Sequence, residues 1–268
     1  VVSLLLSQSL GAGKSMLDRW QPAHETQGRI ALADLFPADE EELLTSAPPP
    51  PEVSLPFGVY PLDDDFHSWR GVAYLEGRGV SKAVAMEHDV RYWTAQRKIV
   101  FPIVMDGTIV GYQWRTTEST APIEIVGEDG FIKLVKPLKT ASQPEDLQRD
   151  RVLMFHDRLL HSPHAILTEG PFDAMKTHLC GGGVTTMGSA VSDGQLALIG
   201  NRRIYSGLDP DAIQLTADLV RKRDLSELYW MEIPKQYEDL GQMPAEEVLD
   251  VFHAAKKVLS SHVFISLL

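Results

Sequence analysis

Short apolar segments alternate with helical segments through the C-terminal part of the chain, and this alternation limits the possible folds more than any other feature. The four apolar segments lie at residues 165–168, 184–187, 203–208 and 228–233. Helices are expected after them, at residues 171–179, 192–199, 211–222 and 245–259. Strands that alternate with helices form a parallel sheet covered on both faces. The pattern therefore predicts an α/β domain.

The preceding residues follow a different pattern. Residues 68–90 have helical character, with Ser81 as an expected helix cap. Two apolar runs, 99–104 and 108–115, flank the dipeptide Asp106-Gly107, which is typical of a tight β-hairpin turn. We expect a smaller α+β subdomain before the parallel sheet.

Composition divides the chain into four parts. Residues 1–20 have the spacing of an amphipathic helix, and residues 34–56 form an acidic, proline-rich linker that includes four consecutive prolines. We expect an N-terminal helix and linker, a subdomain, the parallel-sheet domain and a tail. Their expected bounds are 1–56, 57–160, 161–260 and 261–268.

Three acidic residues are expected to converge at one edge of the parallel sheet, and a fourth, Asp173, could point back at the same site. Glu169 follows the first strand, and Asp209 and Asp211 follow the third. Ligands of parallel sheets bind beyond the carboxyl ends of the strands. In an extended segment, side chains two residues apart share one side, so Asp209 and Asp211 could face the same ion. Asp173 lies one helical turn after Glu169. Carboxylates suit Mg²⁺, so the pattern favours a metal site, although acids at helix N-termini are often simply solvated.

Charge and cysteine content limit the function classes. The net charge of −12 argues against broad, non-specific binding of nucleic acid. The single cysteine, Cys180, can form neither an internal disulfide nor a cysteine zinc site, and it fits a cytoplasmic location. No apolar run reaches the roughly 18 residues of a membrane span, so we expect no membrane partner. Because the chain does not begin with Met, we expect a fragment or a processed piece.

Two segments resemble the motifs of Toprim domains. Residues 168–174, Thr-Glu-Gly-Pro-Phe-Asp-Ala, resemble the first motif, and residues 208–212, Leu-Asp-Pro-Asp-Ala, resemble the Asp-x-Asp motif. Residues 186–190 are similar to a segment of DnaG-type primases that precedes a helix. Asp239 lies where those primases have Lys-Asp-Pro, but Lys and Pro are absent here. The resemblance implies that Glu169, Asp209 and Asp211 are catalytic metal ligands, with Asp173 and Asp239 as further ligands.

Upstream residues resemble phage and plasmid primases. Residues 74–79 resemble their Tyr-Leu-x-x-Arg-Gly element, and residues 97–102 and 110–115 resemble the basic subdomain that precedes Toprim. The resemblance implies that basic side chains bind template, primer and nucleotide phosphates, although each could instead form part of a solvated face. These residues are Arg97, Lys98, Arg115, Lys136 and Lys139. Trp93 and Trp114 are expected to pack in the core rather than stack on bases.

The family implies a DNA primase core without its zinc ribbon. Such an enzyme makes short RNA primers from ribonucleoside triphosphates on single-stranded DNA, with Mg²⁺ or Mn²⁺, and works with a replicative helicase. A Toprim nuclease or topoisomerase-like enzyme is one alternative, but no domain that would supply a tyrosine nucleophile is evident. A non-catalytic replisome or nucleic-acid-binding module is the other alternative. A cluster of like charges would bring such a module no benefit.

Overall fold

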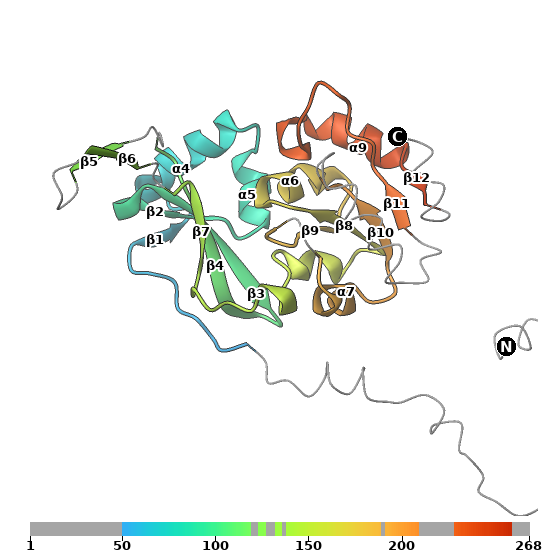
Figure 1. Cartoon of the computed structure of the whole chain (residues 1–268), viewed down its shortest axis with the longest axis horizontal. Helices are drawn as coiled ribbons and strands as arrows, with labels where there is room; N and C mark the ends of the chain where they lie inside the picture. Colours follow the sequence, from blue (N-terminus) through green and yellow to red (C-terminus); the bar gives the residue numbers. More distant parts are fainter. Residues whose placement is uncertain are drawn as a thin grey trace, which may run out of the picture. The chain divides into compact units, whose positions relative to one another are not determined.

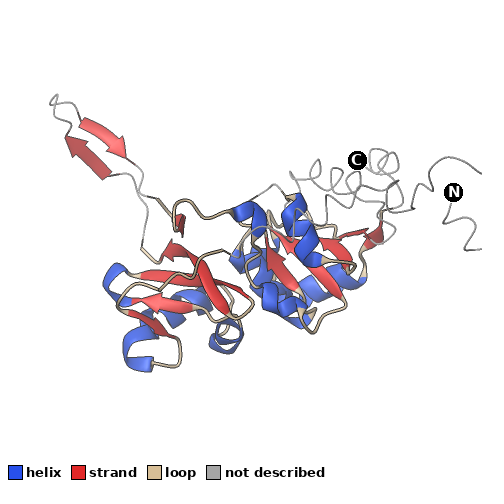
Figure 2. Cartoon of the chain, turned by 90° about the horizontal axis from the view of Figure 1, so that it is seen from below, coloured by secondary structure: helices blue, strands red, loops and turns tan. Residues whose placement is uncertain are grey.

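A computed structural model describes residues 50–118, 123–126, 132–135, 138–188, 191–208 and 228–258, shown in two views in Figures 1 and 2. All of these residues belong to one compact unit, residues 49–268. Most of the expected N-terminal helix and linker lies outside the described residues, and the expected domain boundaries stay a prediction. No helix among the described residues is long and apolar enough to cross a membrane.

The first sheet is antiparallel, with strand order β1-β2-β3-β4-β7. Its strands are β1 (Val59–Pro61), β2 (Arg91–Trp93), β3 (Lys98–Met105), β4 (Thr108–Thr116) and β7 (Thr140–Gln143). The predicted β3–β4 hairpin is confirmed. Asp106 and Gly107 both have positive φ, 49° and 79°, which matches the right-handed twist of a two-residue hairpin. A separate two-stranded ribbon, β5 (Ile123–Val126) and β6 (Ile132–Val135), is inserted between β4 and β7.

Two helices precede β2, as expected. They are α4 (Asp65–Gly77) and α5 (Lys82–Glu87). Helix α4 begins earlier than predicted because the Asp64 side chain caps it by accepting the His67 N–H at 3.2 Å. The predicted Ser81 cap of α5 is confirmed, since its hydroxyl oxygen accepts the Val84 N–H.

The second sheet has strand order β12-β11-β10-β8-β9. Its strands are β8 (His164–Thr168), β9 (Gly183–Thr185), β10 (Arg203–Ser206), β11 (Leu228–Trp230) and β12 (Lys256–Lys257). The first four are mutually parallel and only β12 is antiparallel, so the α/β prediction is confirmed. Its described helices are α6 (Pro171–Lys176), α7 (Asp193–Ile199) and α9 (Ala245–His253). Short 3₁₀ turns complete the described chain: η2 (Thr94–Gln96), η3 (Arg149–Arg151), η4 (His156–Leu159), η5 (Thr177–Leu179) and η7 (Leu240–Gln242).

The last predicted helix was too long. Helix α9 ends at His253, and the chain then returns as β12 beside β11. Val258 is buried, and its N–H donates to the Leu228 carbonyl at 2.8 Å. Extended backbone therefore buries this apolar residue against the sheet, which a continued helix would not. The helix expected at residues 211–222 lies outside the described residues.

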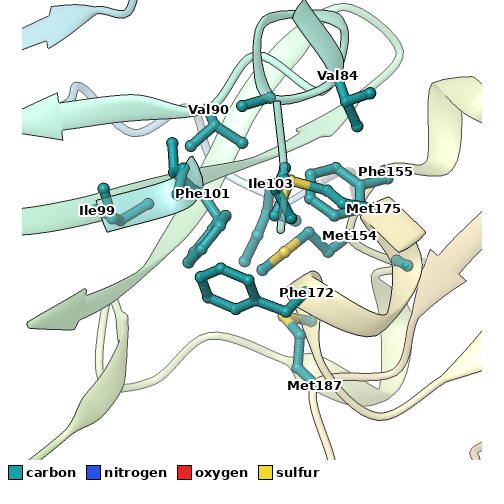
Figure 3. Packing of buried hydrophobic residues seen from close by; sticks show 14 of the residues in the cluster. Val84, Val90, Ile99, Phe101, Ile103, Met154, Phe155, Phe172, Met175 and Met187 are labelled. Atoms are coloured by element: carbon teal, nitrogen blue, oxygen red, sulfur yellow. The ribbon is translucent and has the colours of Figure 1, made fainter. Parts of the chain in front are cut away.

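One hydrophobic cluster joins the two sheets (Figure 3). Ile99, Phe101 and Ile103 of β3 face Phe172 and Met175 of α6 in this cluster. The rings of Phe101 and Phe172 meet edge to face, with centroids 5.6 Å apart. This packing holds the turn between β8 and α6 against the inner face of the first sheet.

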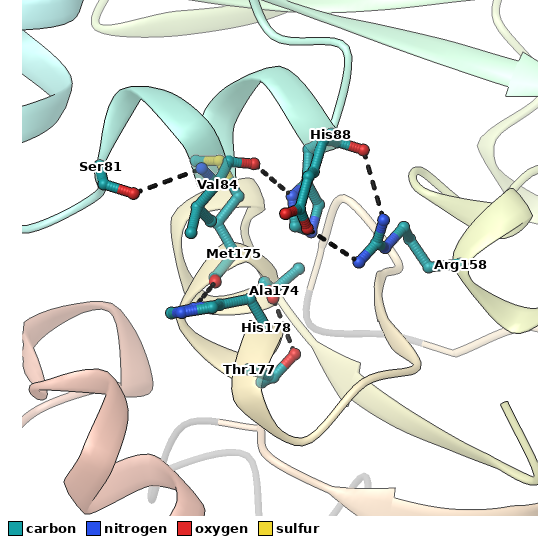
Figure 4. A network of polar contacts seen from close by, with 9 residues as sticks. Ser81, Val84, His88, Arg158, Ala174, Met175, Thr177 and His178 are labelled. Carbon is teal, nitrogen blue, oxygen red and sulfur yellow. Dashed lines mark hydrogen bonds and ion pairs between the residues drawn. The ribbon is translucent and has the colours of Figure 1, made fainter.

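His88 is buried at the end of α5 (Figure 4). Its Nδ1–H donates to the Val84 carbonyl at 2.8 Å, and its ring packs edge to face on Phe155. Burial lowers the pKa of His88 to about 4, although its bond to Val84 opposes the shift. The charges of Arg158 and His178 lower this pKa further, whereas Glu87 raises it.

Acid should destabilise the fold through His88. Since its pKa is depressed in the folded state, the unfolded state binds more protons between pH 6.5 and about 4. The free energy of unfolding should therefore fall by about 3 kcal/mol across that window on account of this residue. Urea unfolding at several pH values should show that the free energy of unfolding depends less on pH in His88→Gln than in the wild type. His253→Gln changes an exposed position and should keep the pH dependence of the wild type. The same pH dependence in all three proteins would contradict the assignment of this effect to His88.

Candidate active site at the carboxyl end of β8

Glu169 lies in the sharp turn between β8 and α6. Gly170 is the N-cap of α6 and Pro171 is its first residue, as predicted. The Gly170 N–H donates to Oδ2 of Asp173 at 3.0 Å, and Asp173 is only 8% exposed. The carboxylate of Asp173, predicted as a metal ligand, therefore also holds the turn that carries Glu169.

Asp239 lies near Asp173, although the two are distant in sequence. A Cβ added to Gly241 would lie 2.4 Å from Oδ1 of Asp173 and 3.3 Å from Oδ1 of Asp239. Oδ1 of Asp239 also caps η7, because it accepts the Gln242 N–H at 2.9 Å. The structure thus brings the late acid of the sequence beside the first motif, with one oxygen of each carboxylate close to the same glycine.

A cavity of about 300 Å³ brings Glu169 and Asp173 together with Arg115 of β4. Nε of Arg115 donates to the Tyr74 hydroxyl at 3.1 Å, and its guanidinium carbon lies 5.5 Å from the centre of the Phe172 ring. Two carboxylates that follow β8, one in the turn and one in α6, and one cation of β4 therefore face one space. The described lining residues are Phe101, Gln113, Arg115, Thr140, Glu169, Gly170, Pro171, Asp173, Met187 and Gly188.

Asp209 and Asp211 lie outside the described residues. The strand that precedes them, β10, pairs in parallel with β8, with Ser206 opposite Leu167. The Gly207 N–H donates to the Leu167 carbonyl at 2.9 Å, so β8 and β10 end at the same edge of the sheet. In the described part of the chain, no group of three or more His, Cys, Asp or Glu side chains could hold a metal ion. The cavity's described lining offers oxygen donors and no His or Cys, a set that suits Mg²⁺ or Mn²⁺.

The predicted basic residues lie on different faces. Arg115 pairs with Ile99 across the β3–β4 ladder, so it shares the inner face with the core and the cavity. Lys98 directly precedes Ile99 in β3 and therefore points to the opposite, outer face. Arg97 is exposed and pairs with Glu118. Lys139 is exposed, whereas Lys136 lies outside the described residues.

The outer face carries a cluster of two indole rings and an ammonium group. Nζ of Lys98 lies 3.6 Å from the centre of the Trp114 ring and 5.5 Å from that of Trp93. Both tryptophans are half-buried, and neither belongs to a core cluster, so the expectation that they pack in the core was wrong. Burial lowers the pKa of Lys98. Residues 57–160 contain fewer Lys and Arg than Asp and Glu, so any binding of phosphate must depend on local clusters.

Arg78 was missed by reasoning from the sequence. Its guanidinium carbon lies 5.0 Å from the centre of the Phe172 ring, so two guanidinium groups contact this one ring. The Tyr-Leu-x-x-Arg-Gly element that contains Arg78 was recognised, but it suggested no role for the side chain. Its position beside α6 becomes visible only in the folded chain.

No protein-family model matches the chain, and neither does any curated protein. The fold is similar to solved primase structures. The RNA polymerase domain of Mycobacterium tuberculosis primase DnaG, in complex with a double-stranded DNA oligomer with a 6-nucleotide overhang, has a TM-score of 0.56 and 15% identity over 76% of this chain and 77% of that one. A DnaG primase catalytic domain bound to single-stranded DNA has a TM-score of 0.54 and 16% identity, covering 74% and 75%. A primase domain from Pseudomonas aeruginosa has a TM-score of 0.51 and 17% identity, covering 69% and 70%. The chain thus has the mixed α/β fold of primase catalytic domains.

Replacing Gly241 should disturb the turn between β8 and α6 that carries Glu169. In Gly241→Ala the new methyl group would collide with the buried Asp173 carboxylate, which is held by the Gly170 N–H. We expect a loss of about 1–3 kcal/mol in the free energy of unfolding, measured by urea denaturation. Gly77→Ala is the matched control because a Cβ there meets nothing within 4 Å. Gly77 ends helix α4, so this control should be neutral or slightly stabilising; equal losses in both variants would contradict the proposed collision.

Proposed function

We propose that the chain is a DNA primase that makes short RNA primers from ribonucleoside triphosphates on single-stranded DNA, in the cytoplasm of a bacterial host. The observation that carries the proposal is the cavity in which Glu169 and Asp173 face Arg115. Carboxylates that can hold a metal ion and a cation that can hold phosphate are the two requirements of phosphoryl transfer. The similarity of the fold to primase catalytic domains supports the same reaction.

The proposed metal is Mg²⁺ or Mn²⁺. Glu169, Asp209 and Asp211 would hold it, with Asp173 and Asp239 in support. The oxygen-rich lining of the cavity fits such a hard cation. When bound, the metal would neutralise the charge that develops on the phosphates during transfer.

The described residues have separate tasks in this proposal. Arg115 would bind phosphate oxygens with its planar guanidinium, which the Tyr74 hydroxyl and the Phe172 ring orient. Asp173 would fix the direction of Glu169 through the Gly170 N–H. Phe101 would supply apolar lining that excludes water from one wall of the cavity.

Template binding is proposed for the basic residues beyond the cavity. The cluster of Trp93, Lys98 and Trp114 offers both a cation for phosphate and aromatic faces for bases. Arg97, Lys136 and Lys139 would add phosphate contacts that hold the strand without reading its sequence. A replicative helicase would be the partner that supplies single-stranded template.

Primer synthesis should depend on the acidic residues. On single-stranded DNA with labelled ribonucleotides and Mg²⁺ or Mn²⁺, the native chain should give short RNA products. Glu169→Gln and the double variant Asp209→Ala/Asp211→Ala should lower the rate by roughly a hundredfold or more, because each weakens metal binding and charge stabilisation. Gel electrophoresis of the products measures the rate.

Glu145→Gln is the matched control for the acidic variants. Glu145 is exposed and follows β7 at the end opposite to Thr140, which lines the cavity. The activity of Glu145→Gln should equal that of the native chain.

Cleavage of the DNA in place of synthesis would favour a Toprim nuclease, and DNA binding without either reaction would favour a replisome-docking module. Both results would reject the primase proposal.

Arg115 and Lys98 should have separable effects. Arg115→Gln should reduce synthesis even at saturating DNA, because the side chain faces the cavity. Lys98→Gln should instead raise the DNA concentration that is needed, and should reduce the slope of log affinity against log salt by about one. Fluorescence anisotropy with a labelled oligonucleotide, alongside the synthesis assay, measures both quantities. Identical defects in the two variants would contradict the assignment of the two residues to different faces.

A further inference from the structure

A second cavity, of about 760 Å³, lies beside the C-terminal half of α6. The end of α4, the start of α5, His178 of η5, η7 and the start of α9 complete its wall. It shares no lining residue with the cavity at Glu169. Its volume is in the range of small-molecule sites, roughly 300–1,000 Å³. The charged side chains among its described lining residues are Arg78, Lys176 and Glu246.

Lys176 is a buried cation in this wall. It is 5% exposed, and its Nζ donates to the Gly79 carbonyl at 2.9 Å. An ammonium group has three N–H donors, and no carboxylate pairs with this one within the described part of the chain. Burying a charge without an opposite charge is costly. Among the described residues, Nζ has no hydrogen-bond acceptor besides the Gly79 carbonyl, so the cavity wall offers further N–H donors to a ligand.

Arg78 contributes a second positive charge to this wall. Burial lowers the pKa of Lys176, the charge of Arg78 lowers it further, and Glu246 partly opposes both. Glu246 is exposed at the start of α9. Two cations and one exposed carboxylate leave the wall favourable for an anion.

The backbone is shaped around the ammonium group. Gly79 has φ +70°, and a Cβ there would lie 2.6 Å from Nζ of Lys176. Both the backbone conformation and the close approach of Lys176 thus require glycine at this position. The contact joins residues 97 positions apart, from α6 and from the turn after α4.

We propose that this cavity binds the phosphates of a nucleoside di- or triphosphate, with Lys176 and Arg78 as the phosphate-binding residues. The volume exceeds what a single phosphate needs and accommodates a nucleotide. Ammonium and guanidinium groups are the usual partners of phosphate oxygens. Glu246 limits the affinity by repelling the anion. The site requires no metal and acts independently of the proposed primer synthesis.

Calorimetric titration of the full chain with ATP in EDTA tests the site. Removing divalent metal excludes binding through metal held by carboxylates. The native chain should bind ATP, and Lys176→Met should weaken the affinity by roughly tenfold or more. Glu246→Gln should strengthen it severalfold. Lys256→Met is the matched control, because Lys256 is exposed, pairs with Glu232 and does not line the cavity.

Three results would overturn the proposal. One is the absence of binding up to millimolar ATP. Another is equal affinity in the native chain, Lys176→Met and Glu246→Gln. The third is metal-free binding of a single-stranded oligonucleotide, sensitive to Lys176, without binding of ATP. If thermal unfolding shows that Lys176→Met does not fold, Glu246→Gln decides: unchanged affinity overturns the proposal. Primer synthesis is not measured, so its failure leaves this test intact.

Discussion

The contact between Phe172 and Phe101 is the interaction on which the candidate site depends. Phe172 follows directly after the turn that carries Glu169 and packs edge to face on Phe101 of the first sheet. Because Arg115 neighbours Phe101 on the inner face of that sheet, the same contact brings Arg115 to the acidic turn. The guanidinium carbons of Arg78 and Arg115 lie 5.0 and 5.5 Å from the centre of the same Phe172 ring. One apolar side chain thus sets the distance between the carboxylates and the nearest cations.

Burial of like charges explains why the acidic turn is built so tightly. Asp173 is almost inaccessible, and Asp239 approaches the same glycine. Carboxylates placed together in a protein repel each other unless hydrogen bonds or cations compensate. Backbone N–H groups of Gly170 and Gln242 supply part of that compensation. A cation bound between the carboxylates would reduce their repulsion, which is the physical reason to connect this geometry with a metal-dependent reaction.

Local signals in the sequence were sufficient for most of the fold. Apolar runs, the cap at Ser81 and the first helical residue Pro171 located strands and helices, because their effects extend over only a few residues. The end of α9 was missed because the burial of Val258 depends on Leu228, which is distant along the chain. For the site, Glu169 and Arg115 could be selected by residue type and by resemblance. Their meeting in one cavity, and the separation of Lys98 onto the other face, depend on how the sheets pack and how the strands alternate.

Phosphate binding by this acidic chain depends on where individual cations are placed. With a net charge of −12, the chain repels phosphate at long range, and salt screens that repulsion beyond roughly 10 Å. Binding of a phosphate-bearing ligand therefore requires cations at contact distance in partly desolvated positions. Lys98 beside two indole rings, Arg115 in the acidic cavity and Lys176 bonded to the Gly79 carbonyl each have such a position. Each is held by a named aromatic ring, hydroxyl or carbonyl group, so the geometry of these three cations is set before any ligand arrives. Preorganised cations bind an anion with little loss of side-chain entropy, which offsets part of the cost of approaching an acidic protein.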